Sequence, residues 1–362
     1  MSNKRLIAIN LPQYHPFKEN DEWWGKGFTE WTNVVKARPR FKGHYQPHLP
    51  ADTGFYDLRL PEARQMQADM AKKYGIYGFC YYHYWFNGKQ LMERPIKEIL
   101  SSGKPDFPFM LCWANENWTR AWNGENKEIL IEQKYSEQDD IEHMEYLCTN
   151  VFNDPRYIRI NNKPFFVVYR PNLIPDIANT IAVWRNIAKK HNINLYLGFM
   201  RPREGQEDIL LQSGFDTAID FHPHMDIRKK WYLDINAWTD CFREHILRKK
   251  SYIMPTLFDY SKYVNIVTSR PYPKFKQFPG LTPGWDNSAR RVGKSFHALT
   301  NSTPSAYGKW LRHILDSFKP FSEEENFVFI NAWNEWAEGN HLEPDQKWGT
   351  SYLEETKKQI SK

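Results

Sequence analysis

Two carboxylates three residues apart, Glu335 and Glu338, lie in a tryptophan-rich segment near the end of the chain. Trp333 and Trp336 flank Glu335, and the segment follows the apolar run 327–330, so we expect a loop at the end of a buried strand. Cleavage of a glycosidic bond usually needs one carboxyl group that protonates the leaving oxygen and a second that assists on the other side. Tryptophan can stack on a sugar ring while its polar edge hydrogen-bonds. The motif therefore favours sugar chemistry over the alternative, a solvated loop whose tryptophans only fill the core.

An excess of aromatic residues supports this interpretation. The 362-residue chain contains 15 Trp, 20 Tyr and 23 Phe, more tryptophan than core packing alone requires. The net charge of +6 is mild and the dense basic runs are confined to 228–230 and 248–250, which argues against nucleic acid as a partner. No apolar stretch is long enough for a transmembrane segment or a signal peptide, so we expect a cytoplasmic protein. Cysteines without pairing or metal-type spacing agree with a reducing compartment; they are Cys80, Cys112, Cys148 and Cys241.

Short apolar runs alternate with longer amphipathic segments along most of the chain. We predict strands near residues 6–11, 76–82, 107–113, 164–169, 195–199, 217–221, 278–282 and 327–333. Helices are predicted near 61–74, 92–101, 137–152, 175–191, 208–213 and 305–318. This alternation predicts an α/β fold with parallel strands, a (β/α)8 TIM barrel in a single domain over 1–362, with insertions at about 17–60 and 225–275. A doubly wound open sheet is the alternative, but residues 11–16 lack its glycine-rich phosphate turn.

The loops after the strands build the active site of such a barrel. In this chain those loops hold aromatic and hydrogen-bonding residues that we expect to bind the substrate. They are Tyr14 and His15 after the first strand, His83 and Tyr84 after the second, Trp113, Asn115, Glu116 and Trp118 after the third, His222 after the sixth, Trp285 and Asp286 after the seventh, and Trp333, Asn334 and Trp336 after the eighth.

Several of these residues have alternative roles. Glu116 could be a third catalytic carboxylate, but binding a sugar hydroxyl or pairing with Arg120 is the more ordinary role. His222 and His224 would face the same way on a strand, as metal ligands do. Third and fourth ligands cannot be placed from the sequence, so we predict no metal and no cofactor. His15 and His83 are interpreted as hydroxyl ligands or satisfied inner histidines rather than general bases.

The segment 231–248 mixes aromatic and basic residues. It could contact a membrane surface or a lipid-linked substrate, although a solvated helical face is the more ordinary explanation. Other chemistries lack their motifs: the sequence contains no GxSxG elbow, no GxxxxGK[ST] loop and no HExxH pair. It also has no Asp-x-Asp triplet of the kind common in metal-dependent sugar-nucleotide transferases.

Four motifs resemble those of the WbsX-like proteins of bacterial surface-polysaccharide clusters. They are residues 11–16, 20–33, 278–287 and 333–344, and the likeness extends from residue 6 to about 353. Such proteins are described as glycosyltransferases. Their domain is similar to glycoside hydrolase family 99, whose members are (β/α)8 barrels that cleave α-mannosidic linkages internally. The resemblance adds Glu30 and Trp31 to the expected substrate-binding residues.

The hydrolase signature Asn-Glu-Trp-x-Glu-Gly falls on residues 334–339. By this resemblance, Glu335 is the base that deprotonates the sugar's own 2-hydroxyl, which attacks the anomeric carbon to give an anhydro-sugar. Glu338 protonates the leaving oxygen and later activates water, with net retention, a departure from ordinary two-carboxylate catalysis. Ala337 stands where the hydrolases commonly carry histidine, and the first strand lacks their aromatic-rich opening. The catalytic pair therefore carries over better than the sugar specificity, and mannose is not assumed.

The sequence thus predicts an enzyme that cleaves or transfers glycosidic bonds in the metabolism of a bacterial surface polysaccharide, O-antigen or capsule. Its expected substrate is an oligosaccharide or polysaccharide, lipid-linked forms included, with peripheral membrane contact as one consequence. A nucleotide-sugar-dependent glycosyltransferase is the first alternative, although no diphosphate-binding motif is found. A non-catalytic carbohydrate-binding protein is the second, and the presence of both carboxylates argues against it.

Overall fold

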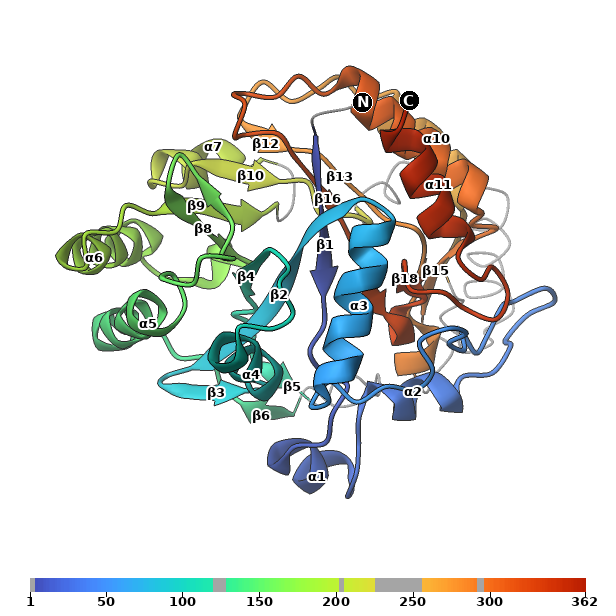
Figure 1. The fold of residues 1–362 in the computed structure, drawn as a ribbon, viewed down its shortest axis with the longest axis horizontal. Helices are drawn as coiled ribbons and strands as arrows, with labels where there is room; N and C mark the ends of the chain where they lie inside the picture. The colour runs from blue at the N-terminus through green and yellow to red at the C-terminus, as the bar shows by residue number, and fades with distance from the viewer. Residues whose placement is uncertain (1–3, 120–127, 202–204, 225–255, 292–295) are drawn as a thin grey trace, which may run out of the picture.

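Parallel strands form a nearly closed barrel in a computed structural model that describes residues 4–119, 128–201, 205–224, 256–291 and 296–362. Figure 1 shows the barrel with its helices around it. The strand order is β12-β10-β9-β8-β4-β2-β1-β16-β13. Their bounds are β1 (Arg5–Asn10), β2 (Ile76–Phe86), β4 (Phe109–Trp113), β8 (Lys163–Val168), β9 (Tyr196–Met200), β10 (Thr217–Ile219), β12 (Gln277–Phe278), β13 (Gly280–Leu281) and β16 (Phe327–Ile330).

The seventh barrel position is one strand in two pieces, β12 and β13, with Pro279 between them. Gln277 pairs with Ala218 of β10, and Gly280 pairs with Phe329 of β16, so the two pieces join the two edges of the sheet. Proline has no N–H to donate to a ladder, which explains the break. A Cβ on Gly280 would lie 1.8 Å from the carbonyl oxygen of Asp220, so only glycine permits this approach. Eight strand positions result, and the predicted (β/α)8 single-domain fold is confirmed.

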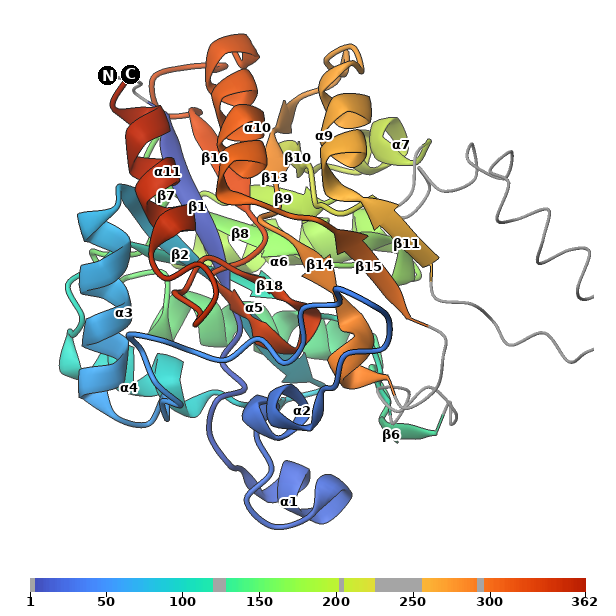
Figure 2. The same cartoon turned by 90° about the vertical axis from the view of Figure 1, so that its right-hand side faces the viewer.

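Helices cover the outside of the barrel in both views (Figures 1 and 2). Several begin at a residue suited to a first helical turn: Pro61 and Pro304 at the start, and Ser136, Asp176 and Thr303 as side-chain caps. The helices are α3 (Pro61–Lys73), α4 (Arg94–Ser102), α5 (Glu137–Asn150), α6 (Ile177–Lys190), α7 (Glu207–Gln212), α9 (Tyr260–Thr268), α10 (Pro304–Ser317) and α11 (Ser351–Ile360), with the 3-10 helix η2 (Pro171–Leu173).

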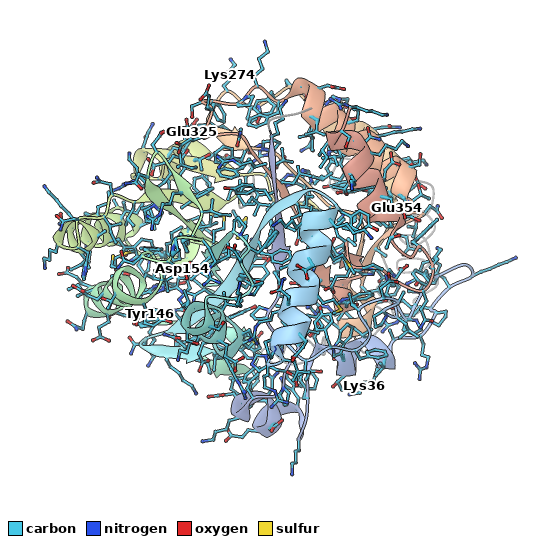
Figure 3. The ribbon with its side chains drawn as sticks, viewed as in Figure 1. Lys36, Tyr146, Asp154, Lys274, Glu325 and Glu354 are labelled. Atoms are coloured by element: carbon cyan, nitrogen blue, oxygen red, sulfur yellow. The ribbon has the colours of Figure 1, made fainter. Side chains whose placement is uncertain are left out.

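Phenylalanines fill one layer of the barrel interior; Figure 3 shows the side chains on the ribbon. Phe165 of β8 lies 5.9 Å from Phe278 of β12 and 6.2 Å from Phe329 of β16, measured between ring centroids. Phe327, two residues earlier on β16, faces the same way and packs on Phe278 at 5.7 Å. The interior is therefore a packed apolar core rather than a channel, and the polar residues collect beyond its end.

Additional elements gather at the end of the barrel toward which β1 points (Figure 1). They are α1 (Lys18–Trp24), α2 (Glu30–Lys36), β3 (Lys89–Leu91), the hairpin of β5 (Trp118–Thr119) and β6 (Ile129–Ile131), the small sheet of β11 (Thr256–Asp259), β14 (Trp285–Asp286) and β15 (His297–Thr300), and the hairpin of β17 (Asn334–Glu335) and β18 (Asn340–His341). The short strand β7 (Arg159–Ile160) lies elsewhere, because it pairs with the first residues of β8. The carboxyl end of the barrel is thus the elaborated end.

The two predicted insertions are described to different extents. Residues 17–60 form α1, α2 and extended segments that run beside the carboxyl end (Figure 2). The second insertion is described only from residue 256 onward, so both basic runs and the segment 231–248 lie outside the described residues. Within the described ranges, no helix has both the length and the hydrophobicity needed to cross a bilayer. Cys80, Cys112 and Cys148 are buried free thiols, and Cys241 lies outside the described ranges.

Candidate active site

One arginine binds three glutamates at the carboxyl end of the barrel. The guanidinium of Arg290 donates from Nε to Oε1 of Glu30 at 2.6 Å and from Nη2 to Oε2 of Glu335 at 2.7 Å. Its Nη1 donates to Oε1 of Glu338. Residues from three loops, which lie far apart in the sequence, therefore meet at one guanidinium, whose fork geometry suits carboxylates.

The backbone after β16 places the two catalytic candidates on one side. Glu335 ends β17, and Glu338 ends the 3-10 helix η5 (Trp336–Glu338). Side chains three residues apart eclipse one another on a 3-10 turn, so the spacing in the sequence becomes proximity in space. Gly339 closes the turn at φ 54°, where a Cβ would lie 3.0 Å from that of Asp286. A glycine is thus needed directly after Glu338.

The four charged side chains differ in exposure. Glu30 is fully buried, Arg290 and Glu335 retain 8% and 7% of their side-chain surface, and Glu338 retains 19%. The hydrogen bonds from Arg290 reach Oε2 of Glu335 and Oε1 of Glu338. The open side of the cluster is therefore the side of Glu338.

Burial sets the protonation of this cluster. It raises the pKa of Glu335 to about 8, an effect that Arg290 opposes and that Glu338 and Glu30 reinforce. Burial also raises the pKa of Glu338, again against Arg290. Burial acts on Arg290 in the opposite direction, but the three carboxylates hold its pKa well above the usual value. Three carboxylates with one guanidinium would carry a net charge of −2, and this excess of negative charge acts in the same direction as burial, toward higher carboxyl pKa values.

The two flanking tryptophans are structural residues in this fold. Trp333 and Trp336 are 0% and 1% exposed, so neither presents a face on which a sugar could stack. Their indole N–H groups donate to Oε1 and Oε2 of Glu343 at 2.8 and 2.7 Å. The expectation that these rings bind substrate is therefore corrected: they anchor the loop that carries the carboxylates.

Glu343 is the residue that organises this anchor, and the sequence analysis did not single it out. Besides the two indoles, Gln67 donates to its Oε1 at 2.7 Å and Tyr56 donates to its Oε2 at 2.8 Å. Burial raises the pKa of Glu343 to about 7, while the four donors stabilise the anion. The signal that could have identified it was its place in the motif 333–344, eight residues after Glu335.

A second group of expected binding residues supports the cluster from behind. Tyr14 is fully buried and donates to the carbonyl oxygen of Asn334. Asn334 in turn accepts from the N–H of Leu11 at 2.7 Å through its Oδ1. Trp31 packs on Trp336 at 5.6 Å between ring centroids and donates to the carbonyl of Tyr56. These three residues hold β1, α2 and the catalytic loop together.

The candidates after the first and second strands divide between surface and interior. His15 is buried and its Nδ1 lies 3.0 Å from the carbonyl oxygen of Pro12, and His83 is buried against His143 with 3.0 Å between their Nε2 atoms. Each histidine thus has a polar partner within the fold, as expected for an inner residue. Tyr84 is half-buried, and burial, reinforced by the charge of Glu335, raises its pKa.

The candidates after the third strand have partners other than the carboxylate cluster. Trp113 is buried and donates to the carbonyl of Trp85 at 3.1 Å, and Trp118 packs on Tyr84 at 5.4 Å between centroids. Asn115 is buried and bridges Tyr135 and the backbone of Arg170. Glu116 is exposed and pairs with Arg170 at 3.0 Å; its expected partner, Arg120, lies outside the described residues. Trp113 and Asn115 therefore have structural roles.

Two further polar groups line the carboxyl end. Asp286 accepts from Gln46 at 2.8 Å and lies 2.6 Å from Nε2 of His44, partners that the sequence did not indicate. His222 is buried with its Nε2 3.0 Å from Asp220 and its Nδ1 2.7 Å from the hydroxyl of Tyr263. Asp220 also lies 2.6 Å from Nε2 of His224, so the two histidines share one carboxylate as a closed polar network.

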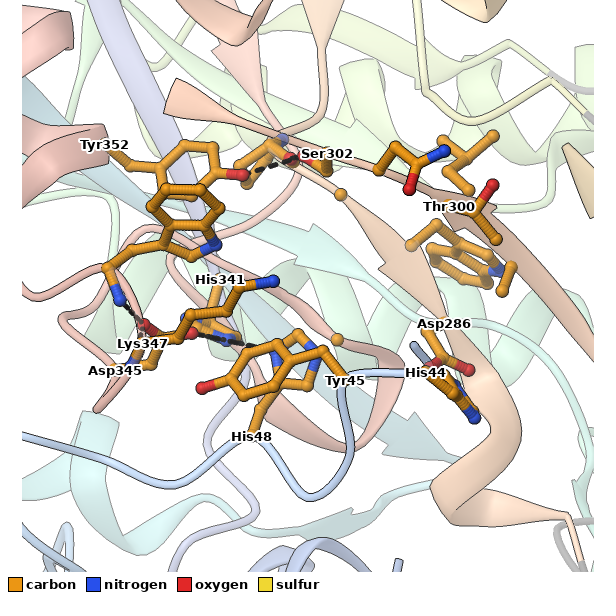
Figure 4. Close-up of a pocket in the computed structure, with 18 of the residues that line it drawn as sticks. His44, Tyr45, His48, Asp286, Thr300, Ser302, His341, Asp345, Lys347 and Tyr352 are labelled. Atoms are coloured by element: carbon orange, nitrogen blue, oxygen red, sulfur yellow. Dashed lines mark hydrogen bonds and ion pairs between the residues drawn. The ribbon is translucent and has the colours of Figure 1, made fainter. Parts of the chain in front are cut away.

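A cavity of about 110 Å³ adjoins the catalytic loop at Gly339 and Asp286 (Figure 4). Trp285 contributes to its wall, and its buried indole N–H has no hydrogen-bond partner in the described parts of the chain. The rest of the wall mixes aromatic and polar side chains, including Tyr45, Asn301, Ser302, Lys347, Trp348 and Tyr352. Of the expected binding residues, Trp285 and Asp286 line this cavity, and Glu30 belongs to the cluster around Arg290.

The fold is one that solved glycoside hydrolases share. The GH99 endo-alpha-mannosidase from Bacteroides thetaiotaomicron superposes with a TM-score of 0.59 at 14% identity, covering 99% of this chain and 96% of that one. A structure titled glycoside hydrolase-like protein gives a TM-score of 0.60 at 12% identity, covering 99% and 94%. At such identities the likeness defines the class of fold, a GH99-like (β/α)8 barrel.

Sequence comparison then defines the family. The family described as Glycosyltransferase WbsX matches residues 6–356, and the chain belongs to it. The uncharacterized protein WxcX of Xanthomonas campestris pv. campestris (strain B100) is 39% identical over 361 residues. That alignment covers 99% of this chain and 50% of the relative, so the chain spans about half the length of the curated relatives it matches.

Proposed function

We propose that the chain cleaves or transfers glycosidic bonds of a bacterial surface polysaccharide or its precursor, with retention of anomeric configuration. The observation that carries this proposal is the buried Glu335–Glu338 pair held by Arg290 at the carboxyl end of the barrel. The shared guanidinium holds both carboxyl groups at one site, and retention would follow from attack by the sugar's own 2-hydroxyl, a departure from ordinary two-carboxylate retention. The family and the hydrolase-like fold support the same class of enzyme.

In the proposed reaction, a carboxylate oxygen of Glu335 takes the proton of the sugar 2-hydroxyl. At the same time the 2-oxygen of the sugar forms a bond to the anomeric carbon. The bond from the anomeric carbon to the leaving oxygen breaks, and Glu338 gives its proton to that oxygen. Water or an acceptor hydroxyl then loses a proton to Glu338 and attacks the anomeric carbon. The bond between the 2-oxygen and the anomeric carbon breaks, and the 2-oxygen regains its proton from Glu335. One proton shared by the pair is what this sequence of steps requires.

The test is an assay of the purified chain on the surface polysaccharide of its source organism and on the lipid-linked precursor, with product anomers followed by NMR. We expect the retained anomer to be the first product formed, without added nucleotide sugar. First formation of the inverted anomer would contradict the proposal. A cytoplasmic site of action is part of the proposal, supported by the buried free thiols of Cys80, Cys112 and Cys148.

The family description supports one alternative, a glycosyltransferase that uses a nucleotide sugar. That enzyme would need a site for a diphosphate. Thermal stabilisation by a nucleoside diphosphate, together with product formation only in the presence of a nucleotide sugar, would favour it over the retaining glycosidase. A sugar-binding protein without activity would give no product with any activated glycoside.

Arg290 provides a prediction about pH. Replacing it by methionine removes the positive charge that favours both carboxylates, so the pKa values of Glu335 and Glu338 rise further. Since the base must be ionised, we expect the acidic limb of the kcat/KM profile to move to higher pH by about one unit or more. Arg290→Lys keeps the positive charge but loses the forked guanidinium that contacts several carboxylates. We therefore expect kcat to fall, while the acidic limb of the kcat/KM profile moves less than in Arg290→Met.

The matched control is Arg170→Met, which removes the partner of the exposed Glu116 and should leave the profile in place. Circular dichroism checks that both Arg290 variants are folded. An unchanged acidic limb in a folded Arg290→Met enzyme would show that the guanidinium does not set the protonation of the pair.

A further inference from the structure

Two histidines and an aspartate meet at the wall of the cavity next to the catalytic loop (Figure 4). His48 comes from the segment between α2 and α3, His341 ends β18, and Asp345 follows four residues later. Nδ1 of His48 lies 2.9 Å from Nε2 of His341, and Oδ2 of Asp345 lies 4.0 Å from each of these nitrogens. None of the three belongs to the carboxylate cluster around Arg290.

The orientation of each donor is fixed by a second contact. Nδ1 of His341 lies 2.9 Å from the carbonyl oxygen of Glu343, so Nδ1 carries the ring hydrogen and Nε2 presents its lone pair to the cluster. Oδ1 of Asp345 accepts from the N–H groups of Lys347 and Trp348 at 3.1 and 2.6 Å, which turns Oδ2 toward both histidines. Such outer contacts are how proteins orient metal ligands.

The three separations leave room for a small divalent ion in the plane of the three donor atoms. A point equidistant from atoms 2.9, 4.0 and 4.0 Å apart lies roughly 2.1 Å from each, within the range of zinc–nitrogen and zinc–oxygen bonds. A hydrogen bond from Nδ1 of His48 to Nε2 of His341 accounts for the two nitrogens alone. It does not account for the carboxylate oxygen, which at 4.0 Å is too far from both nitrogens for a hydrogen bond.

We propose that His48, His341 and Asp345 bind one divalent transition-metal ion, of which Zn²⁺ fits the donor set of two imidazoles and a carboxylate. On binding, the hydrogen of His48 moves from Nδ1 to Nε2, a change of tautomer without net loss of a proton. The remaining coordination positions face the cavity, which has room for water there. This site was not predicted from the sequence, because its ligands lie at positions 48, 341 and 345.

The ion would connect the loop before α3 to the catalytic hairpin. The ring of His341 stacks on Trp336 with 3.8 Å between centroids and 15° between planes, and Trp336 lies between Glu335 and Glu338. The loop of His48 also carries His44 and Gln46, which hold Asp286. Metal binding therefore couples the wall of the cavity to the loop that carries the carboxylate pair.

The experiment uses the chain without a histidine tag, first treated with a chelator and then titrated with ZnCl₂ by calorimetry. We expect one ion per chain and a rise in the thermal unfolding temperature. Asp345→Asn keeps the oxygen that accepts the backbone N–H groups but replaces Oδ2 by an amide. Because even changes outside the ligand sphere weaken metal sites by about 10–100-fold, this variant should lose at least that much affinity.

The second histidine–aspartate group supplies the control. Asp220, His222 and His224 also place possible ligand atoms near one another, so His224→Ala tests whether zinc binds there instead. The proposal requires stoichiometric zinc binding in His224→Ala and its loss in His341→Ala. The opposite pattern, or binding unaffected by both His341→Ala and Asp345→Asn, would overturn it. Circular dichroism and thermal unfolding in the presence of chelator establish that each variant is folded, so a loss of binding is not a loss of structure.

Discussion

Replacing Glu335 or Glu338 by glutamine will reduce turnover of a glycosidic substrate by about 10²–10⁴-fold, the range typical for loss of a general acid or base. Both side chains are held in place by Arg290 through one oxygen, and glutamine keeps an oxygen in either position. We therefore expect the fold and sugar binding to persist. Initial rates and binding of the same oligosaccharide, measured in parallel, check the prediction.

The two roles can be separated by the leaving group. A glycoside with an acidic phenol as leaving group needs no protonation, so Glu338→Gln should regain much of its first-step rate on that substrate. Glu335→Gln should not, because its loss removes the base that activates the 2-hydroxyl. Glu62→Gln, a change of an exposed carboxylate in the first turn of α3, serves as the control. Rescue of Glu335→Gln instead of Glu338→Gln would reverse the assignment, and near-normal activity of either variant would refute it.

Replacing Glu343 by alanine will lower the free energy of unfolding by about 3–5 kcal/mol, because it leaves buried donors without an acceptor. The donors are the indoles of Trp333 and Trp336, the amide of Gln67 and the hydroxyl of Tyr56. Glu343→Gln retains one oxygen and should have a smaller effect, about 1–3 kcal/mol. Urea and thermal unfolding at neutral pH measure both.

Glu62→Ala is the matched control, since Glu62 is exposed in the first turn of α3. It should change stability by less than about 0.5 kcal/mol. If Glu343→Ala unfolded at the same urea concentration as the control, the four hydrogen bonds would not be stabilising the catalytic loop. Because Trp336 lies between Glu335 and Glu338, a folded Glu343 variant should also lose activity through displacement of that loop.

The barrel could be predicted from the sequence because each strand is a short apolar run and each covering helix a longer amphipathic segment. Every predicted strand corresponds to a barrel strand, and the predicted strand 278–282 differs only in being interrupted at Pro279. The last strand ends at Ile330 rather than at residue 333, although the N–H of Trp333 still donates to the carbonyl oxygen of Ile9 in β1. Helices α1, α2, α9 and α11 were not predicted.

The candidate site was predicted less completely, for a physical reason. Spacing along one segment identified Glu335 and Glu338, since local geometry on a short turn converts sequence spacing into proximity. Arg290 is 45 residues from Glu335 and 260 from Glu30, so only the closed barrel brings the ion pairs together. Burial also decides what an aromatic residue does. Trp333 and Trp336 have the composition of a sugar-binding surface, but they lie beneath it and bind Glu343.

The position of Arg290 has a consequence for inhibitors. Basic sugar mimics bind to glycosidases by pairing their positive charge with a catalytic carboxylate. Here the chain already provides a cation, attached covalently and held against Glu335, Glu338 and Glu30. A positively charged sugar mimic must therefore displace the Arg290 guanidinium from the carboxylates or bind beside it and be repelled by it. Neutral or anionic sugar mimics avoid that competition. If the proposed function is correct, charge alone would distinguish this chain from glycosidases whose carboxylate pair has no arginine between its members.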